Sequence, residues 1–244
     1  MKNIIYVVGI GPGQDNQMTE LAKNVLDSCD VIVGYTVYLE LLGDRYADKD
    51  FISTPMRQEV KRCELCFEEA EKGKRVAIIC SGDAGIYGMA SLMYEIGKEH
   101  PETELKIIAG ITAASSGAAE LGAPLNHDFC VISLSDLLTP WQVIEKRLRA
   151  AAYGDFAIAI YNPSSKKRAD YLKRACDILL ESGVKEMTAC GYVQNIGRWG
   201  TTTCTCSLKE LREKQVDMFT TVFIGNSQSE IVEGKLITKR GYDV

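Results

Sequence analysis

The chain has 244 residues, of which 46% are hydrophobic and 25% charged, and its formal net charge is −5. This composition is typical of a globular protein in solution, and the acidic balance argues against a general nucleic-acid binder. No apolar run reaches the roughly 18 residues that a membrane helix needs. The N-terminus enters an apolar run without the basic region of a signal peptide. We therefore expect a cytoplasmic protein that binds neither membrane nor nucleic acid.

The nine cysteines are an odd number, and several lie inside apolar patterns. This favours buried thiols in a reducing compartment over a disulfide framework. Cys63 and Cys66 form a C-x-x-C within an expected helix, and Cys204 and Cys206 lie in a Thr-rich strand. Core or surface thiols are the favoured interpretation of both pairs. A metal or redox role is the alternative, and the sequence leaves it open.

Strands and helices alternate through the first half of the chain. An apolar, β-branched run at residues 4–8 predicts a buried parallel strand, and G-I-G-P-G follows it at 9–13. Thr19 is a plausible N-cap for the first helix. The alternation predicts a mostly parallel sheet with its turns at the carboxyl ends of the strands. Further strands are expected at 30–35, 51–54, 75–80 and 105–108, and helices at 18–28, 37–42, 58–72 and 86–98.

The pattern changes from about residue 112. Strands are expected at 129–134, 156–161, 187–193, 200–206 and 220–225, and helices at 113–121, 140–152, 166–182 and 207–213, with a short hairpin in the tail. One sheet of ten strands would be unusual. We therefore expect two α/β domains, residues 1–114 and 115–244, with mostly parallel or mixed sheets.

Three turns rich in small residues follow apolar runs, at residues 9–13, 81–85 and 109–113. Gln14 follows the first turn, so the third glycine of a dinucleotide fingerprint is missing, and no acidic residue ends the second strand. There is no G-K-[ST] of a P-loop. Tight packing would explain one such turn. Three at adjacent strand ends favour a ligand that approaches the backbone closely.

Together these stretches resemble the tetrapyrrole methylase family. The resemblance is carried by V-G-I-G-P-G (8–13), S-G-D-A-G-I-Y-G-M-A (81–90) and G-I-T-A-A-S-S (110–116), and it covers the whole chain. It implies two α/β domains with a cleft between them, S-adenosylmethionine as methyl donor, S-adenosylhomocysteine as product, and a homodimer. No protein-bound metal is implied, because the sulfonium already activates the methyl group.

Four further motifs narrow the resemblance: 34–42, 127–141, 159–168 and 220–227. They are similar to the branch of the family that acts in cobalamin synthesis on precorrin-3B or cobalt-precorrin-3. The implied reaction is methylation at carbon 17 with ring contraction to the precorrin-4 level, and the presence of cobalt stays open. The alternatives are a methylase acting on another corrin position, on uroporphyrinogen III or on a protein side chain, and a non-catalytic nucleotide-binding α/β protein of the flavodoxin type.

The resemblance also assigns residues. Asp83 is the one carboxylate in the three turns, and the alternative for it is a helix N-cap ahead of residue 86. Capping or packing is likewise the alternative to a catalytic role for His127. The cofactor-binding candidates are Pro12, Ser81, Gly82, Asp83, Ile86, Thr112, Ala113, Asn162, Asn195 and Val222, and the catalytic candidates for proton transfer are Asp136 and His127.

The implied substrate carries many carboxylates, so an acidic protein must offer local cations. A solvated charged face is the alternative for each cation. Substitution of Gly11 by Val is expected to weaken donor binding or macrocycle entry while leaving the fold largely intact. The substrate-binding candidates are Gly11, Tyr35, Arg57, Ser135, Lys166, Arg168 and Arg198.

Overall fold

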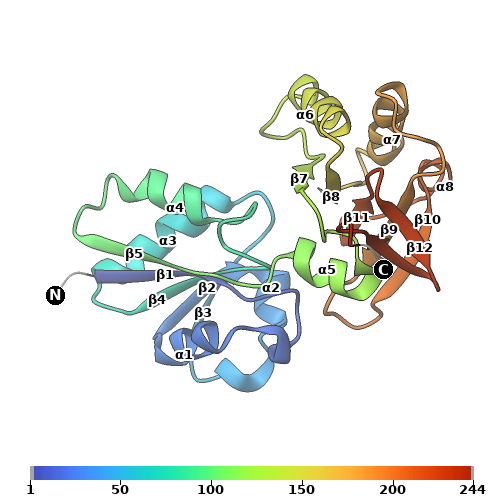
Figure 1. Ribbon diagram of the computed structural model, residues 1–244. Helices are drawn as coiled ribbons and strands as arrows, with labels where there is room; N and C mark the ends of the chain where they lie inside the picture. Colours follow the sequence, from blue (N-terminus) through green and yellow to red (C-terminus); the bar gives the residue numbers. More distant parts are fainter. Residues whose placement is uncertain (1–2, 243–244) are drawn as a thin grey trace. The chain divides into compact units, whose positions relative to one another are not determined.

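The computed structural model describes residues 3–242, and the chain forms two compact units, the first ending at Thr112 and the second beginning at Ala113 (Figure 1). Unit 1 contains a single sheet with the strand order β3-β2-β4-β1-β5. Every neighbouring pair in it is parallel, so all five strands end at the same edge. The strands are β1 (Asn3–Gly9), β2 (Val31–Tyr35), β3 (Asp50–Thr54), β4 (Val76–Cys80) and β5 (Thr103–Ile108).

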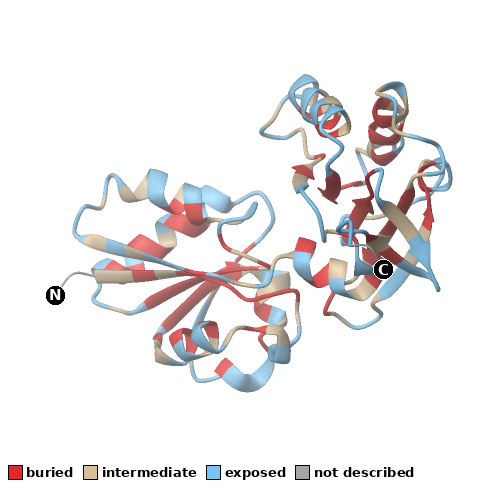
Figure 2. Cartoon of the chain, viewed as in Figure 1, coloured by how far each residue is buried: buried red, intermediate tan, exposed pale blue. Residues whose placement is uncertain are grey.

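Helices cover both faces of this sheet. Alternate residues of a strand face opposite sides, so Val7 packs toward α3 (Glu59–Glu71) and α4 (Ala90–Gly97), whereas Val8 packs toward α1 (Glu20–Ser28). Figure 2 shows the central strands of the sheet largely buried, whereas the outer strands β3 and β5 and the outer sides of the helices are partly exposed. The short elements η1 (Asp15–Gln17), α2 (Thr36–Glu40) and η2 (Gly43–Tyr46) complete the unit.

Unit 2 is built around a mixed sheet with the order β10-β9-β11-β8-β7. Only β7 and β8 pair in parallel; the other neighbours are antiparallel. Together with the parallel sheet of unit 1, this confirms the predicted α/β class with parallel and mixed sheets. The strands are β7 (Phe129–Ser133), β8 (Ala157–Tyr161), β9 (Ala189–Gln194), β10 (Thr202–Ser207) and β11 (Thr220–Ile224).

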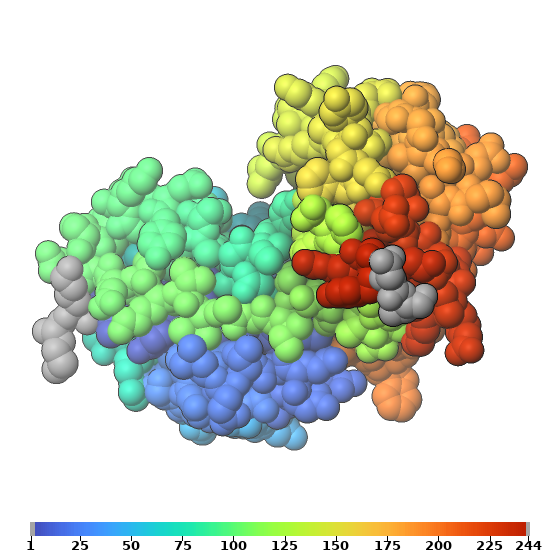
Figure 3. Space-filling model, in the orientation of Figure 1, coloured from blue at the N-terminus to red at the C-terminus, as the bar shows by residue number. Residues whose placement is uncertain are grey.

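Two layers also cover the sheet of unit 2. On one face α6 (Trp141–Tyr153) and α7 (Tyr171–Glu181) pack side by side over Ile158 and Ile160. Their side chains, yellow and orange in Figure 3, fill the space between the two ribbons. The other face packs Ala159 and Phe223 against α5 (Ala113–Leu121). The helix α8 (Leu208–Leu211) follows β10 and begins with a capping box at Ser207.

The tail forms the predicted hairpin. β12 (Ser229–Val232) and β13 (Lys235–Thr238) pair in an antiparallel manner, and β13 also pairs with β6 (Gly122–Ala123). Within the described part of the chain, no helix is both long and apolar enough to cross a membrane.

Two helices begin later than the sequence pattern predicts. α4 begins at Ala90 rather than at residue 86, and α7 begins at Tyr171 rather than at residue 166. In both cases the extra residues form a loop at the carboxyl end of a strand. The predicted helix starts were therefore wrong, and both loops contain candidate site residues.

Candidate functional site

The three small-residue turns of unit 1 lie against one another, because they follow the neighbouring strands β4, β1 and β5. Gly11 and Gly82 exchange two backbone hydrogen bonds, with N···O distances of 3.0 and 2.7 Å. A Cβ on Gly110 would lie 2.2 Å from the carbonyl oxygen of Gly82, and one on Gly9 would lie 2.7 Å from the Gly110 nitrogen. These glycines therefore permit close contact between backbones, and we call this cluster of Gly9, Gly11, Gly82 and Gly110 the glycine junction.

Gly11 is subject to two constraints. Its φ of +73° lies in the region that favours glycine, and a Cβ there would be 2.7 Å from the Gln17 carbonyl oxygen. The expectation that Gly11→Val leaves the fold intact is therefore wrong, because the new side chain would meet backbone. A role for Gly11 in substrate binding stays a prediction.

Asp83 joins the second turn to the third. Its Oδ1 accepts a hydrogen bond from the Gly85 nitrogen at 2.7 Å, and its Oδ2 accepts one from the Gly110 nitrogen at 2.9 Å. The alternative role as a helix N-cap is wrong, since α4 begins at Ala90 and its N-cap is Met89. Asp83 is half-buried, so one side of the carboxylate stays near solvent.

The other candidates of unit 1 lie at the same edge, because every strand of a parallel sheet ends there. Pro12 is buried and Ser81 half-buried, whereas 39% of Ile86 is exposed. Tyr35 ends β2, and its ring packs edge-on against Tyr38 at a centroid distance of 5.1 Å. The exposed Arg57 follows β3 with a φ of 67°. Thr112 and Ala113, where the units join in sequence, are half-buried.

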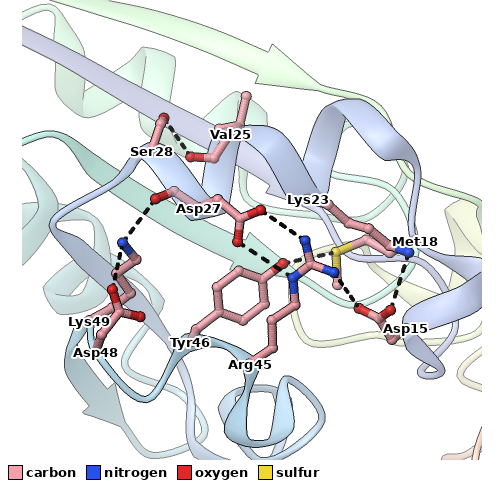
Figure 4. A network of polar contacts seen from close by, with 10 residues as sticks. All are labelled: Asp15, Met18, Lys23, Val25, Asp27, Ser28, Arg45, Tyr46, Asp48 and Lys49. Carbon is pink, nitrogen blue, oxygen red and sulfur yellow. Dashed lines mark hydrogen bonds and ion pairs between the residues drawn. The ribbon is translucent and has the colours of Figure 1, made fainter.

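A charged network holds the segment that follows the glycine junction (Figure 4). The Arg45 guanidinium lies 2.8 Å from an Asp27 oxygen and 3.8 Å from an Asp15 oxygen, and Lys23 lies 3.2 Å from Asp15. Beneath it the fully buried Tyr46 donates its hydroxyl to the Met18 sulfur at 3.9 Å. The network joins η1 to α1 and η2 and so fixes the exit of the first turn.

In unit 2 the candidates gather where β7, β8 and β9 end. Ser133 pairs with Tyr161 in register, so the residues after these two strands share an edge with Asn195, which follows β9. Asn162 and Asn195 have φ values of 52° and 56°, a conformation that asparagine adopts more readily than most residues. Thr201 secures the second of them by donating its hydroxyl to the Asn195 carbonyl at 2.8 Å.

A polar cluster fastens the loop after β7 to the segment before α7. The Asn162 amide donates to the Ser133 hydroxyl at 3.0 Å, and Arg168 donates to the Ser135 hydroxyl at 2.8 Å. Arg168 also lies 3.5 Å from an Asp136 oxygen. Sequence analysis predicted four members of this cluster separately, and the structure brings them together: Asn162, Ser135, Arg168 and Asp136.

Tyr171 completes this cluster and was missed from the sequence. Its hydroxyl donates to Asp136 Oδ2 at 2.5 Å. This hydrogen bond, aided by Arg168 and opposed by burial, lowers the pKa of Asp136 below its ordinary value. The same bond raises the pKa of Tyr171. Asp136 is therefore a carboxylate at neutral pH, which suits a proton acceptor rather than a donor. The sequence pattern placed residue 171 inside a helix at 166–182. The one signal that could have indicated its role is that this helix begins close to a loop with candidate site residues.

His127 lies away from this cluster. It precedes β7 whereas Asp136 follows that strand, so the two catalytic candidates stand at opposite ends of one strand. His127 Nδ1 accepts a hydrogen bond from the backbone N–H of its neighbour Asp128 at 2.8 Å. It lines a pocket of about 300 Å³ together with Asp155, Asn226 and Arg240. The two catalytic candidates therefore do not lie together, and a catalytic role for His127 stays a prediction.

The remaining candidates of unit 2 differ in accessibility. The side chain of Val222 is fully buried in the core under α6 and α7, so it offers no surface to a cofactor. Arg198 is half-buried with its guanidinium 5.1 Å from the Phe219 ring centroid, and Lys166 is exposed.

The cysteine pairs lie in apolar surroundings. Cys63 and Cys66 are fully buried under the sheet of unit 1, and burial raises the pKa of Cys63 to about 12. Cys206 is buried and Cys204 half-buried. All nine cysteines are free thiols. Among residues 3–242, no group of three or more His, Cys, Asp or Glu side chains is arranged to hold a metal ion.

The fold and these sites define a two-unit α/β protein whose polar candidates gather at strand ends, where open α/β sheets bind ligands. A family model described as tetrapyrrole (corrin/porphyrin) methylases matches residues 4–212. The chain belongs to this family.

Individual relatives are similar over nearly the whole chain. A protein of Salmonella typhimurium, named as a probable cobalt-factor III C(17)-methyltransferase, is 44% identical over 98% of this chain and 99% of its own length. A precorrin-3B C(17)-methyltransferase of Sinorhizobium is 38% identical over 96% and 92%. The crystal structure of the methyltransferase CobJ matches with a TM-score of 0.89 and 36% identity, over 97% of this chain and 100% of that one.

Proposed function

We propose that the protein is an S-adenosylmethionine-dependent methyltransferase of cobalamin synthesis, which methylates carbon 17 of a precorrin-3-level macrocycle and contracts the ring. The observation that carries this proposal is the 44% identity to the Salmonella protein over nearly the full length of both chains. The relative named for the cobalt form is more similar than the one named for precorrin-3B, at 44% against 38% identity. We therefore take cobalt-factor III as the preferred acceptor.

The edge of unit 1 supports a role in holding the donor. An adenosyl sulfonium has apolar and polar parts, and this edge offers both kinds of surface. Ile86 and Ile111 are 39% and 38% exposed beside the half-buried Asp83 carboxylate. We assign donor binding to Pro12, Ser81, Gly82, Asp83, Ile86, Thr112 and Ala113, with Asn162 and Asn195 as the candidates of unit 2.

For methyl transfer the protein needs to do little more than hold donor and acceptor in position and exclude water from the site. Carbon 17 attacks the methyl carbon, the carbon–sulfur bond breaks, and its electron pair stays on sulfur to leave neutral S-adenosylhomocysteine. The enzyme accelerates such a step by aligning donor and acceptor and by excluding water. Ring contraction adds proton transfers, and the ionised Asp136 is our candidate acceptor. Arg57, Lys166 and Arg198 are the candidate partners of substrate carboxylates.

Labelled donor and a set of acceptors test the proposal. The protein is incubated with methyl-labelled S-adenosylmethionine and, separately, cobalt-factor III, precorrin-3B and uroporphyrinogen III. We expect one labelled methyl group on the first acceptor, slower transfer to the second and none to the third, with a changed macrocycle absorption spectrum that reports ring contraction. Methylation of uroporphyrinogen III alone would contradict the proposal.

A thermal-shift measurement examines the alternative of a non-catalytic nucleotide-binding protein. We expect S-adenosylhomocysteine to raise the melting temperature, whereas dinucleotides and flavins leave it unchanged. Stabilisation by a dinucleotide alone would favour the alternative. The resemblance also favours a cytoplasmic homodimer. Sedimentation of the purified chain tests whether it forms the dimer.

A further inference from the structure

Tyr171 is the first residue of α7, and its hydroxyl donates a hydrogen bond to Asp136. We propose that Tyr171 is a positioning residue of the ring-contraction step, which holds the Asp136 carboxylate at the angle and distance from which it accepts a proton from the substrate. This proposal rests on the function proposed above. It concerns the chemistry after methyl transfer and not the binding of the donor.

The Asp136 carboxylate is held from two sides by one segment. Tyr171 occupies Oδ2 at 2.5 Å, and Arg168 faces Oδ1 at 3.5 Å. Tyr171 begins α7 and Arg168 lies in the segment just before it, while Asp136 belongs to the loop after β7. The carboxylate remains 31% exposed, so it stays accessible to a reacting group. A side chain fixed in this way keeps one orientation without losing its access to substrate.

Tyr171 is itself held by its neighbours. Its ring packs against Trp141, the first residue of α6, with a centroid distance of 4.6 Å. The Arg174 guanidinium lies 4.0 Å from the Trp141 ring centroid and 5.0 Å from that of Tyr171. The next residue, Leu172, is buried in the core that α6 and α7 share. The phenol therefore ties the Asp136 carboxylate to the position of two packed helices, in addition to the contacts that Arg168 makes with the same loop.

The charges around Asp136 predict how its titration depends on Tyr171. The groups that face it are the Tyr171 phenol and the Arg168 guanidinium, and Arg174 acts on the phenol from the next turn of α7. The hydrogen bond from Tyr171 is the largest cause of the lowered pKa of Asp136. Loss of the hydroxyl must raise that pKa, because the charged form loses its strongest donor.

The first experiment is the substitution Tyr171→Phe, which removes the hydroxyl and keeps the ring between Trp141 and Arg174. The Asp136 carboxyl is titrated by NMR in protein labelled with ¹³C-aspartate, and Asp136→Asn assigns the signal. We expect the midpoint of Asp136 to rise and the acidic limb of the kcat/KM profile to move upward with it. We also expect kcat for ring contraction to fall about 10- to 100-fold, while the affinity for S-adenosylhomocysteine is unchanged.

Tyr153→Phe is the matched control, because this tyrosine ends α6 in the same unit and is 94% exposed. It should leave the Asp136 titration, the pH profile and kcat unchanged. If Tyr171→Phe raises the Asp136 midpoint but moves neither the acidic limb nor kcat, the contact is structural and the proposal is wrong. An unchanged Asp136 midpoint in that variant overturns it as well.

Two further measurements keep the test decisive. If Tyr171→Phe does not fold, Arg168→Gln provides a second test on the same carboxylate, because Arg168 faces the other oxygen of Asp136, Oδ1. It should shift the midpoint and the acidic limb together in the same direction, and a shift of the midpoint alone would overturn the proposal. Failure of the wild-type protein to methylate any corrin acceptor would contradict the proposed function instead. In that case the NMR titration still reports whether Tyr171 controls Asp136.

Discussion

The two units hold the loops at their sheet edges by different means. In unit 1 the turns after β4, β1 and β5 touch through glycine backbones, and the Asp83 carboxylate also joins two of them. In unit 2 the loops after β7 and β8 are joined by side chains, from Ser133 through Arg168 to Tyr171. A backbone junction tolerates no added atom, whereas a side-chain cluster is weakened one contact at a time. Substitutions in the two kinds of junction should therefore differ in their cost to stability.

The largest effect is expected from Gly110→Ala. The new Cβ would lie 2.2 Å from the Gly82 carbonyl oxygen and 2.6 Å from the Gly9 carbonyl, both of them backbone atoms that cannot rotate away. We expect the free energy of unfolding to fall by about 3 kcal/mol or more, measured by urea denaturation. Gly73→Ala is the control, since open space surrounds it and only its φ of +83° opposes the substitution. It should cost about 1 kcal/mol, and equal losses would mean that the junction is loose.

A smaller loss is expected from Asp83→Ala. Two backbone N–H groups, those of Gly85 and Gly110, lose a charged acceptor. This should destabilise unit 1 by about 2 kcal/mol and weaken the binding of S-adenosylhomocysteine, as measured by calorimetry. Asp83→Asn keeps one acceptor oxygen and should recover part of the stability. If both variants bind the ligand as the wild type does, Asp83 has no role in donor binding.

The sequence predicted what depends on neighbours along the chain. Thr19 is the N-cap that its position indicated, accepting from the Ala22 nitrogen at 3.2 Å. The positions of the strands, and the edge of the sheet at which their turns lie, followed from the apolar runs alone. The alternative role of Asp83 as an N-cap was wrong because α4 begins later than expected, and its contact with Gly110, 27 residues away, could not be predicted from neighbours along the chain. The bond from Tyr171 to Asp136 spans 35 residues and was equally hidden.

Strand direction alone separates the two catalytic candidates, because His127 precedes and Asp136 follows the five residues of β7. The burial of Val222 was also indicated by its central place in an apolar run. A candidate taken over from a resemblance therefore needs a check against strand direction and burial before it is grouped with others.

Alkaline pH should affect both units alike. Burial raises the pKa of Cys63 in unit 1 and of Cys176 in unit 2 to about 12, from 9.0. Above pH 9 the unfolded chain releases these protons while the folded chain retains them, so stability falls as pH rises from 9 toward 12. Urea midpoints measured across this range should decline, and Cys176→Ala should flatten the decline. A constant midpoint would show that the thiols are not buried as described.

The smallest effect is expected from Arg45→Gln in the network of Figure 4. Arg45 pairs with Asp27 and Asp15 at a surface where all three side chains are well exposed, so water and salt screen the attraction. We expect the melting temperature to decrease by less than it does in Asp83→Ala, and we expect this decrease to vanish in high salt. The buried Tyr46 beneath it keeps its contact with Met18 and continues to hold η2 against the segment after the glycine junction. A loss as large as that of Gly110→Ala would mean that exposed charges, and not backbone contact, fix the turns of unit 1.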